Sequence, residues 1–503
     1  MSPAIWLVWL PSQMLSFKKG AEHEVHRQLN RHSDIPLYKQ IEQIIKEKIL
    51  QGEWPAGTKI PSQRKLASMF QVNRSTVTAA LDELTAQGLL EGNRGGGTKV
   101  ANQIWSELTA GPPLDWTNYV RSGIHRPNSM TVQEINRQEF KEGVIRLGTG
   151  ELAPELLPYQ QMEKILRGAA SERLMLGYEE PKGNRYTREV LAAHLSRKGV
   201  RASADSILIV SGALQALQLI SIGLLKRRAV VLTEKPSYLY SLHVFQSMDM
   251  RLCGLPMDAG GLDPSVIPAV KKRHGADLLY TIPSFHNPTG KLMSEDRKRE
   301  LIQISKQLSL PVIEDDAYGD LQLDGPPSSP LKAMDREGSI LYVGTLSKTV
   351  SPGLRIGWVA GPEPVIERLA DIKMQTDYGS SSLSQWAAAK WLSSGLYDEN
   401  LSRIKVELRQ RRDEALRCLE TYCRGIARWE KPSGGFYIWV TFLKPLSLSA
   451  LFEQALQKNI LINPGTLYDK EAKYSIRLSY SYASLTELRY GIQTIAELAG
   501  KLM

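Results

Sequence analysis

The chain has 503 residues, of which 42% are apolar and 23% are charged, so it is long enough to form more than one domain with its own core. The formal net charge of +10 and the pI near 9.2 indicate a polyanionic partner. The three cysteines, Cys253, Cys418 and Cys423, are too few and too scattered for a disulfide scaffold or a zinc site, which favours a reducing cytoplasm and predicts no metal centre.

The first 33 residues show no domain pattern. Residues 4–10 form an apolar run that is too short to span a bilayer, and no basic segment precedes it as in a signal peptide. We therefore expect residues 1–33 to be a disordered or alternative-start extension, with Met14 as the other start. We expect no membrane partner.

Residues 34–101 are predicted to form three helices and a hairpin. Asp34 can cap a first helix, a second begins near residues 61–62, and Asn73 can cap a third. The stretch "GLLEGNRGGGTKV" then supplies two strands about a glycine-rich tip. Helix, turn, helix and wing make an α+β winged helix-turn-helix, which is an arrangement that reads DNA.

Charge favours the same interpretation. Between Trp54 and Leu81 no residue is acidic, and four are basic: Lys59, Arg64, Lys65 and Arg74. A helical module used only for dimerisation is the alternative, since basic residues usually belong to a solvated helix face. The polar run Asn73-Arg74-Ser75-Thr76 favours DNA, because a recognition helix contacts bases and phosphates through its first turn.

The segment resembles the GntR-type winged-helix domains through "PLYKQI", "GTKIPSQRKLA", "VNRSTV" and "GGGTKV". The resemblance implies a double-stranded DNA operator as the partner, with Arg64, Arg74 and Thr76 at phosphates and bases and Gly96 in the wing tip. Thr78 stands where the family often has a second arginine, and Gln63 and Lys65 stand where acidic residues are usual. We expect operator choice to differ accordingly.

Residues 102–143 are predicted to be a linker. They contain Gly111-Pro112-Pro113 and many polar residues with little sustained periodicity. One short helix is expected near residues 129–140.

A lysine draws attention in the remaining 360 residues. In "YVGTLSKTVSPGLRIGW", Lys348 follows a short apolar strand that begins at Ile340, where an α/β sheet delivers side chains into its ligand crevice. A solvated loop lysine is the alternative. A lysine desolvated in a crevice is a nucleophile that forms a Schiff base with an aldehyde, which here suggests pyridoxal 5'-phosphate.

The sequence offers the other groups that pyridoxal phosphate needs. "VIEDDAYGD" ends a strand at Asp315, "SFHNPTG" places Asn287 in a turn, and "EKPSYLY" supplies the aromatic Tyr238. "LIVSGALQALQLI" is a strand, a turn and a helix start, whose free N–H groups near 212–214 can hold a phosphate.

These motifs, with "YEEPKGN" and "IRLSYS", resemble the fold-type I aminotransferases over residues 144–503, roughly seven-tenths of the chain. The resemblance implies a large α/β domain in which Lys348 carries the cofactor and Arg477 binds the carboxylate of an amino acid. It also implies cofactor contacts by Asp315, Tyr318, Asn287, Tyr238, Gly212, Ala213, Leu214, Thr345, Ser347 and Arg355, and by Tyr178 from the neighbouring subunit.

Two points stay open in this part. Ala213-Leu214 stand where the family often has a hydroxyl and an amide side chain, so backbone donors must suffice there. Asp315 is chosen over Asp316 by its spacing to Tyr318, and a shift of one residue would exchange their roles.

A GntR-like domain linked to an aminotransferase-like domain is the layout of the MocR/GabR regulators. Two functions compete: a transcription factor that senses pyridoxal phosphate or its adduct with an amino acid or amine, and an active aminotransferase with a DNA tether. The first is favoured because an enzyme has no need of a winged helix. A head-to-tail homodimer is expected, since Tyr178 would serve another subunit.

Overall fold

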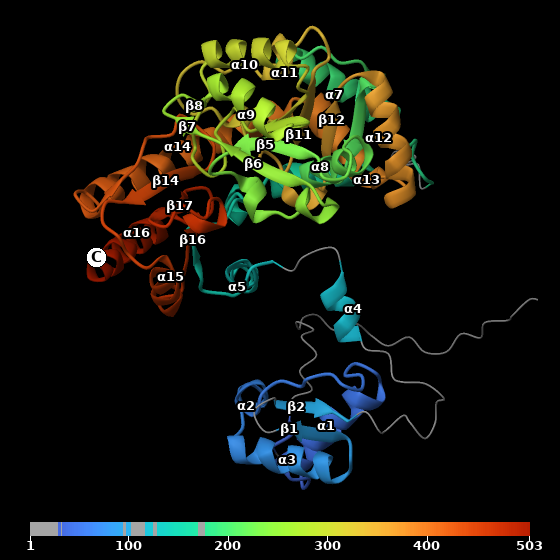
Figure 1. Ribbon diagram of the computed structural model, residues 1–503, viewed down its shortest axis with the longest axis vertical. Coiled ribbons are helices and arrows are strands. Elements are labelled where there is room, and N and C mark those ends of the chain that lie inside the picture. The colour runs from blue at the N-terminus through green and yellow to red at the C-terminus, as the bar shows by residue number, and fades with distance from the viewer. Residues whose placement is uncertain (1–28, 32, 94–96, 102–115, 124–127, 170–176) are drawn as a thin grey trace, which may run out of the picture. The chain divides into compact units, whose positions relative to one another are not determined.

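The computed structural model describes residues 29–31, 33–93, 97–101, 116–123, 128–169 and 177–503. They belong to two compact units, Met1–Gly123 and Ile124–Met503, which are described separately (Figure 1). The division falls inside the expected linker. The expected extension lies outside the described residues as far as residue 28. Within the described ranges, no helix has both the length and the apolar character needed to cross a bilayer.

The small unit is a winged helix-turn-helix, as predicted. Buried Ile41, Ile45 and Ile49 of the first helix pack with Val77 and Leu81 of the third, which forms one core at helical spacing. The elements are α1 (Leu37–Leu50), α2 (Gln63–Phe70), α3 (Arg74–Ala86), the antiparallel strands β1 (Leu90–Asn93) and β2 (Gly97–Val100), and α4 (Trp116–Ser122).

Two of the predicted helix caps differ from the structure. Asp34 does not cap α1, because Pro36 occupies the cap position and its ring has no acceptor. Asn73 does precede α3, but its side chain makes no capping hydrogen bond. Ser62 caps α2 by accepting a hydrogen bond from the Lys65 N–H (3.4 Å).

The large unit is built on a seven-stranded sheet. All its strand pairs are parallel except the two made by β12, which runs antiparallel to both neighbours. The strands, in spatial order, are β4 (Ile207–Val210), β12 (Gly357–Ala360), β11 (Ile340–Thr345), β10 (Val312–Asp315), β9 (Leu278–Thr281), β5 (Val230–Glu234) and β6 (Arg251–Leu255).

Both faces of this sheet are buried, which explains its almost continuous apolar strands. Leu208 and Val210 face a cluster that includes α8 and α12, and the alternating Ile207 and Ile209 face one that includes α7 and α13. The helices around the sheet are α6 (Tyr159–Ala169), α7 (Arg185–Arg197), α8 (Ala213–Gly223), α9 (Ile267–His274), α10 (Glu295–Gln307), α11 (Leu331–Met334), α12 (Glu363–Thr376) and α13 (Ser382–Ser393).

A second layer, orange to red in Figure 1, gathers beside the large sheet. Its four-stranded sheet has the order β13 (Ala427–Arg428), β14 (Tyr437–Phe442), β17 (Ser475–Ser479) and β16 (Asn463–Pro464). Its helices are α14 (Leu396–Tyr422), α15 (Leu448–Gln457) and α16 (Leu485–Leu502). Two short pairs complete the unit: β3 (Ile145–Arg146) with β15 (Ile460–Leu461), and β7 (Met257–Asp258) with β8 (Gly261–Leu262).

The helix expected in the linker is present as α5 (Met130–Gln138). The Ser129 side chain caps it by accepting from the Val132 N–H (3.4 Å), and Ile135 is buried in the core of the second layer. Part of the expected linker therefore packs as an element of the large unit.

Candidate cofactor pocket and DNA-reading helix

A pocket of about 480 Å³ lies where strands of the large sheet end and the β14–β17 layer begins. This volume suits a small ligand. The pocket brings together twelve of the predicted site residues: Gly212, Ala213, Leu214, Tyr238, Asn287, Asp315, Tyr318, Thr345, Ser347, Lys348, Arg355 and Arg477. Most of them lie at the end of a strand of the large sheet or within four residues after it, as expected for a ligand crevice at the carboxyl ends of a parallel sheet.

Lys348 lines this pocket and is half-buried. Its Nζ donates a hydrogen bond to the Gly150 carbonyl (2.7 Å) and lies 6.0 Å from the centre of the Tyr318 ring. A Cβ at Gly150 would lie 2.3 Å from the Tyr437 hydroxyl, so glycine is needed for this close approach. Lys348 is therefore not the solvated loop lysine of the alternative interpretation.

One end of the pocket is shaped for an anion. The Arg355 Nη2 donates to the Ser211 carbonyl (2.7 Å), and a Cβ at Gly212 would lie only 2.7 Å from that nitrogen. The Gly212 N–H donates to Val210, which leaves the first-turn N–H groups of Ala213 and Leu214 for a ligand. A guanidinium beside a helix N-terminus fits a phosphate.

Asp315 and Asp316 take different places. Asp315 lines the pocket and accepts a hydrogen bond from the Tyr280 hydroxyl (2.7 Å), whereas Asp316 binds the Lys198 amine (2.8 Å) and the Tyr342 hydroxyl (2.7 Å). Burial raises the pKa of Asp315 to about 6, although Tyr280 and Lys348 act against this shift. A cation next to Asp315 would hold it ionised.

Arg477 also lines the pocket. Its Nη1 donates to the Asn287 Oδ1 (2.8 Å) and its Nη2 to the Gly148 carbonyl (2.5 Å). The guanidinium stacks on Tyr437 and Tyr468, at 4.2 Å and 4.9 Å from the ring centres. Arg477 is buried and its Nε has no hydrogen-bond partner, which is costly without a ligand.

Several residues in the pocket lining or directly behind it were missed by the sequence analysis. Tyr437 bonds the Tyr318 hydroxyl (3.0 Å), and Tyr280 reaches Asp315 from beside β10. Their partners lie 119 and 35 residues away along the chain, so no local signal marks them. Five further lining residues come from α5 and its flanks: Asn128, Val132, Ile135, Asn136 and Glu139.

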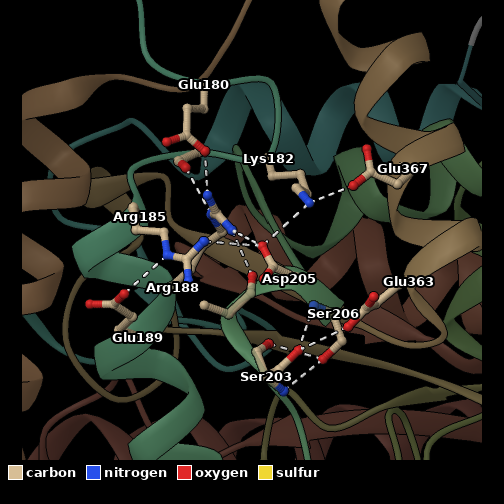
Figure 2. A network of polar contacts seen from close by, with 12 residues as sticks. Glu180, Lys182, Arg185, Arg188, Glu189, Ser203, Asp205, Ser206, Glu363 and Glu367 are labelled. Carbon is tan, nitrogen blue, oxygen red and sulfur yellow. Dashed lines mark hydrogen bonds and ion pairs between the residues drawn. The ribbon is translucent and has the colours of Figure 1, made fainter.

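Tyr178 is the one predicted cofactor residue outside this pocket. Its ring is 80% exposed and packs against Tyr378, with the ring centres 4.8 Å apart. The loop that follows Tyr178 is anchored by buried Arg188, which donates to the Gly183 and Ala204 carbonyls (2.9 and 2.7 Å) (Figure 2). Arg188 also pairs with Glu180 in the same loop.

The predicted DNA-contacting residues gather at one end of the small unit. Arg64, Asn73, Arg74 and Ser75 are exposed, and Thr76 is half-buried. The Arg74 Nε and Nη2 donate to the Gln63 Oε1 (3.1 and 3.0 Å), so the departure at position 63 holds the guanidinium at the start of α3. Gly96 lies outside the described residues.

Comparisons with known proteins give one family match for each of the two units. Residues 37–100 match the bacterial regulatory proteins of the gntR family, and residues 142–495 match the class I and II aminotransferases. The multiple substrate aminotransferase of Thermococcus profundus is 28% identical, with a TM-score of 0.72 over 77% of this chain and 99% of its own. A kynurenine aminotransferase of Pyrococcus horikoshii, solved with PMP, is also 28% identical, with a TM-score of 0.72 over 79% of this chain and 98% of its own.

Fold and pocket together define a pyridoxal phosphate-dependent aminotransferase fold, and pyridoxal 5'-phosphate is its cofactor. The chain is 63% identical over 95% of its length to the uncharacterized HTH-type transcriptional regulator YisV of Bacillus subtilis (strain 168), covering 98% of that protein. It is 34% identical over 87% of its length to NorG of Staphylococcus aureus (strain USA300), an HTH-type transcriptional regulator, and covers 98% of it. The chain belongs to the HTH-type transcriptional regulators that join a GntR DNA-binding domain to a class I and II aminotransferase domain, as in MocR and GabR.

Proposed function

We propose that this transcriptional regulator adjusts its DNA binding when an amino acid or amine occupies the cofactor pocket. The observation that carries the proposal is the pocket itself, which brings together Lys348, an anion-binding group around Arg355, and a buried arginine with an unpartnered Nε. A ligand can shift a protein between two states only by binding one of them better. The pocket therefore has to bind differently in the two DNA-binding states.

We assign the cofactor contacts as follows. Arg355, Thr345, Ser347 and the first turn of α8 would hold the phosphate, Asp315 the ring nitrogen, Tyr238 a ring face, and Asn287 and Tyr318 the phenolic oxygen. The Asn287 Oδ1 already accepts from Arg477, so its Nδ2 is the atom available as a donor to that oxygen. When bound, the cofactor supplies an aldehyde that reacts with primary amines.

Lys348 and Arg477 orient what reacts there. The Lys348 amine has to leave the Gly150 carbonyl to reach a cofactor. The Arg477 guanidinium lies over the Tyr437 and Tyr468 rings, and its planar fork is suited to a bidentate carboxylate. An α-amino acid presents an amine and a carboxylate one carbon apart, which matches this pair.

At the other unit, we propose that Arg64, Asn73, Arg74, Ser75 and Thr76 contact the operator, with Gly96 in the wing. The exposed first turn of α3 is the part of a recognition helix that reaches base edges and phosphates. We further propose a head-to-tail homodimer in which Tyr178 serves the phosphate of the neighbouring pocket. Light scattering at micromolar concentration, with cofactor present, checks this assembly, and a monomer would contradict it.

The experiment that tests the proposal measures operator affinity of the cofactor-loaded protein with and without a panel of amino acids and amines. At least one of them should change the affinity while also changing the visible absorbance of the cofactor. No change in either signal across the panel would contradict the proposal. Because the pocket retains Lys348, Asp315 and Arg477, we keep residual transamination as a second candidate, and continuous keto-acid production in the same samples would reveal it.

A further inference from the structure

The wall of the pocket formed by α5 has no assigned role. The two family matches cover residues 37–100 and 142–495, so α5 and Glu139 lie between them. Nevertheless α5 and its flanks line the pocket through Asn128, Asn136 and Glu139. These side chains therefore lie outside the residue ranges that the two families match.

Glu139 is hydrogen-bonded to the short segment, residues 148–150, whose carbonyl groups accept from Lys348 and Arg477. The Thr149 hydroxyl donates to its Oε1 (2.8 Å), and Thr149 is buried. On either side of Thr149, the Gly150 carbonyl accepts from Lys348 and the Gly148 carbonyl accepts from Arg477. An amino acid whose amine lies at the cofactor beside Lys348 and whose carboxylate lies at Arg477 would therefore share this pocket with Glu139.

After the roles proposed above are assigned, the charged residues that remain in the pocket are all negative. Of the described lining residues, six are charged: Glu139, Glu151, Asp315, Lys348, Arg355 and Arg477. The three cations serve the aldehyde, the phosphate and the carboxylate, and Asp315 serves the ring nitrogen. The two charges left over are both carboxylates, and an anionic side chain placed beside them would be repelled.

We infer that the effector is a diamino monocarboxylic acid, with its second, cationic amine bound by Glu139 at the C-cap of α5. This inference rests on the proposed function, because it places the amine and carboxylate of the effector at the cofactor and Arg477. Glu139 can accept the added cation through Oε2 while Oε1 keeps its bond with Thr149. Asn128 and Asn136 would offer further polar contacts.

The test uses the cofactor-loaded protein and four probes: L-lysine, L-ornithine, the uncharged L-norleucine and the anionic L-glutamate. Binding is measured by calorimetry, and operator affinity is measured in parallel. We expect lysine or ornithine to bind at least about tenfold more tightly than norleucine, with glutamate weakest.

The matched variants are Glu139→Gln and Glu142→Gln. The first keeps an acceptor for Thr149 but removes the charge, and should weaken the diamino acids about tenfold or more while leaving norleucine unchanged. The second changes an exposed carboxylate outside the pocket and should behave as the wild type.

Two outcomes are kept apart by this design. Tighter binding of glutamate or norleucine than of both diamino acids, or a Glu139→Gln variant with the full wild-type preference, would overturn the inference and leave the proposed function intact. If the loaded wild type bound none of the probes or any other amino acid, the proposed function would fail, and the inference would fail with it.

Discussion

The first turn of α3 and the cofactor pocket differ in how their polar side chains are held. Those of the helix are mostly exposed, and those of the pocket are buried in hydrogen-bonded sets. Arg64, Asn73 and Ser75 are exposed, and Arg74 is held by Gln63. In the pocket, Asp315 is bonded to Tyr280, and Arg477 to Asn287 and Gly148, all of them buried or within the core layers.

This difference teaches how each region should respond to change. Exposed contacts to a polyanion act nearly independently, so losing one lowers affinity by a limited factor. Buried polar groups form connected sets in which the loss of one member leaves another unsatisfied. We therefore expect substitutions in the pocket to disturb several groups at once, and substitutions at the DNA surface to act one contact at a time.

The largest effect is expected for Lys348→Ala. It should abolish covalent attachment of the cofactor and the absorbance that accompanies it, while the anion-binding end keeps some cofactor non-covalently. DNA binding should persist but lose its response to the effector, since the lysine lies in the large unit. Absorbance spectra and operator titrations measure this, with exposed Lys470→Ala as the control. A variant with the wild-type spectrum and response would contradict the role of Lys348.

Arg477→Lys should come next, because lysine keeps the charge but not the two-pronged geometry for a carboxylate. We expect amino-acid binding to weaken by about 10- to 100-fold, corresponding to roughly 1.5 to 3 kcal/mol, with the cofactor spectrum of the unliganded protein retained. Calorimetry with an amino acid and with its decarboxylated amine separates the contribution of the carboxylate to binding from that of the rest of the ligand. Equal losses for both ligands would show that Arg477 does not bind the carboxylate.

Arg74→Ala sharpens the comparison from the other side. Loss of one base or phosphate contact should cost about 1 to 3 kcal/mol of operator affinity and leave cofactor absorbance unchanged. Operator titrations at several salt concentrations provide the measurement. Unchanged affinity throughout would remove Arg74 from the interface.

The last effect concerns stability and is confined to high pH. Burial raises the pKa of Glu234 to about 7, so the folded protein holds a proton that the unfolded chain releases near its ordinary pKa of 4.5. Stability should therefore fall as pH rises through this range, and the full cost is present above about pH 7. Glu234→Gln should raise the stability of the cofactor-free protein by about 1 to 3 kcal/mol at pH 8 and change it little at pH 4.5.

The neutral amide that this substitution introduces can keep the acceptor for the Ile282 N–H. Its own N–H groups can turn toward His286 Nε2, which is unpartnered and lies 3.9 Å from the Glu234 carboxylate. Thermal melts across this pH range provide the check. A variant that is destabilised at pH 8 would show that Glu234 is held ionised by groups other than those described.

Sequence reasoning reached the parts of the molecule that are encoded locally. The strand before Lys348 and the helical spacing of Ile41, Ile45 and Ile49 were visible as patterns, and the winged helix and α/β fold were confirmed. The choice between Asp315 and Asp316 could not be settled from spacing, because Lys198, which binds Asp316, comes 118 residues earlier in the chain.

The same limit explains why the contribution of α5 to the pocket was not predicted. α5 has an ordinary amphipathic sequence, and nothing near it indicates that Glu139 meets Thr149 beside a lysine about 200 residues away. A polar stretch between two recognisable domains was therefore interpreted as a linker with one short helix near residues 129–140, and only the pocket-lining role of that helix was missed.

That placement of α5 has a consequence for anyone who exchanges modules between regulators of this kind. A chimera in which a foreign DNA-binding domain is joined before Asn128 would keep α5 and its flanking residues together with the rest of the pocket. A graft at residue 141, at the edge of the recognisable domain, would discard α5 and yield a chimera with a cofactor but an altered ligand preference. The suitable junction for exchanging domains thus lies upstream of the domain boundary that family resemblance suggests.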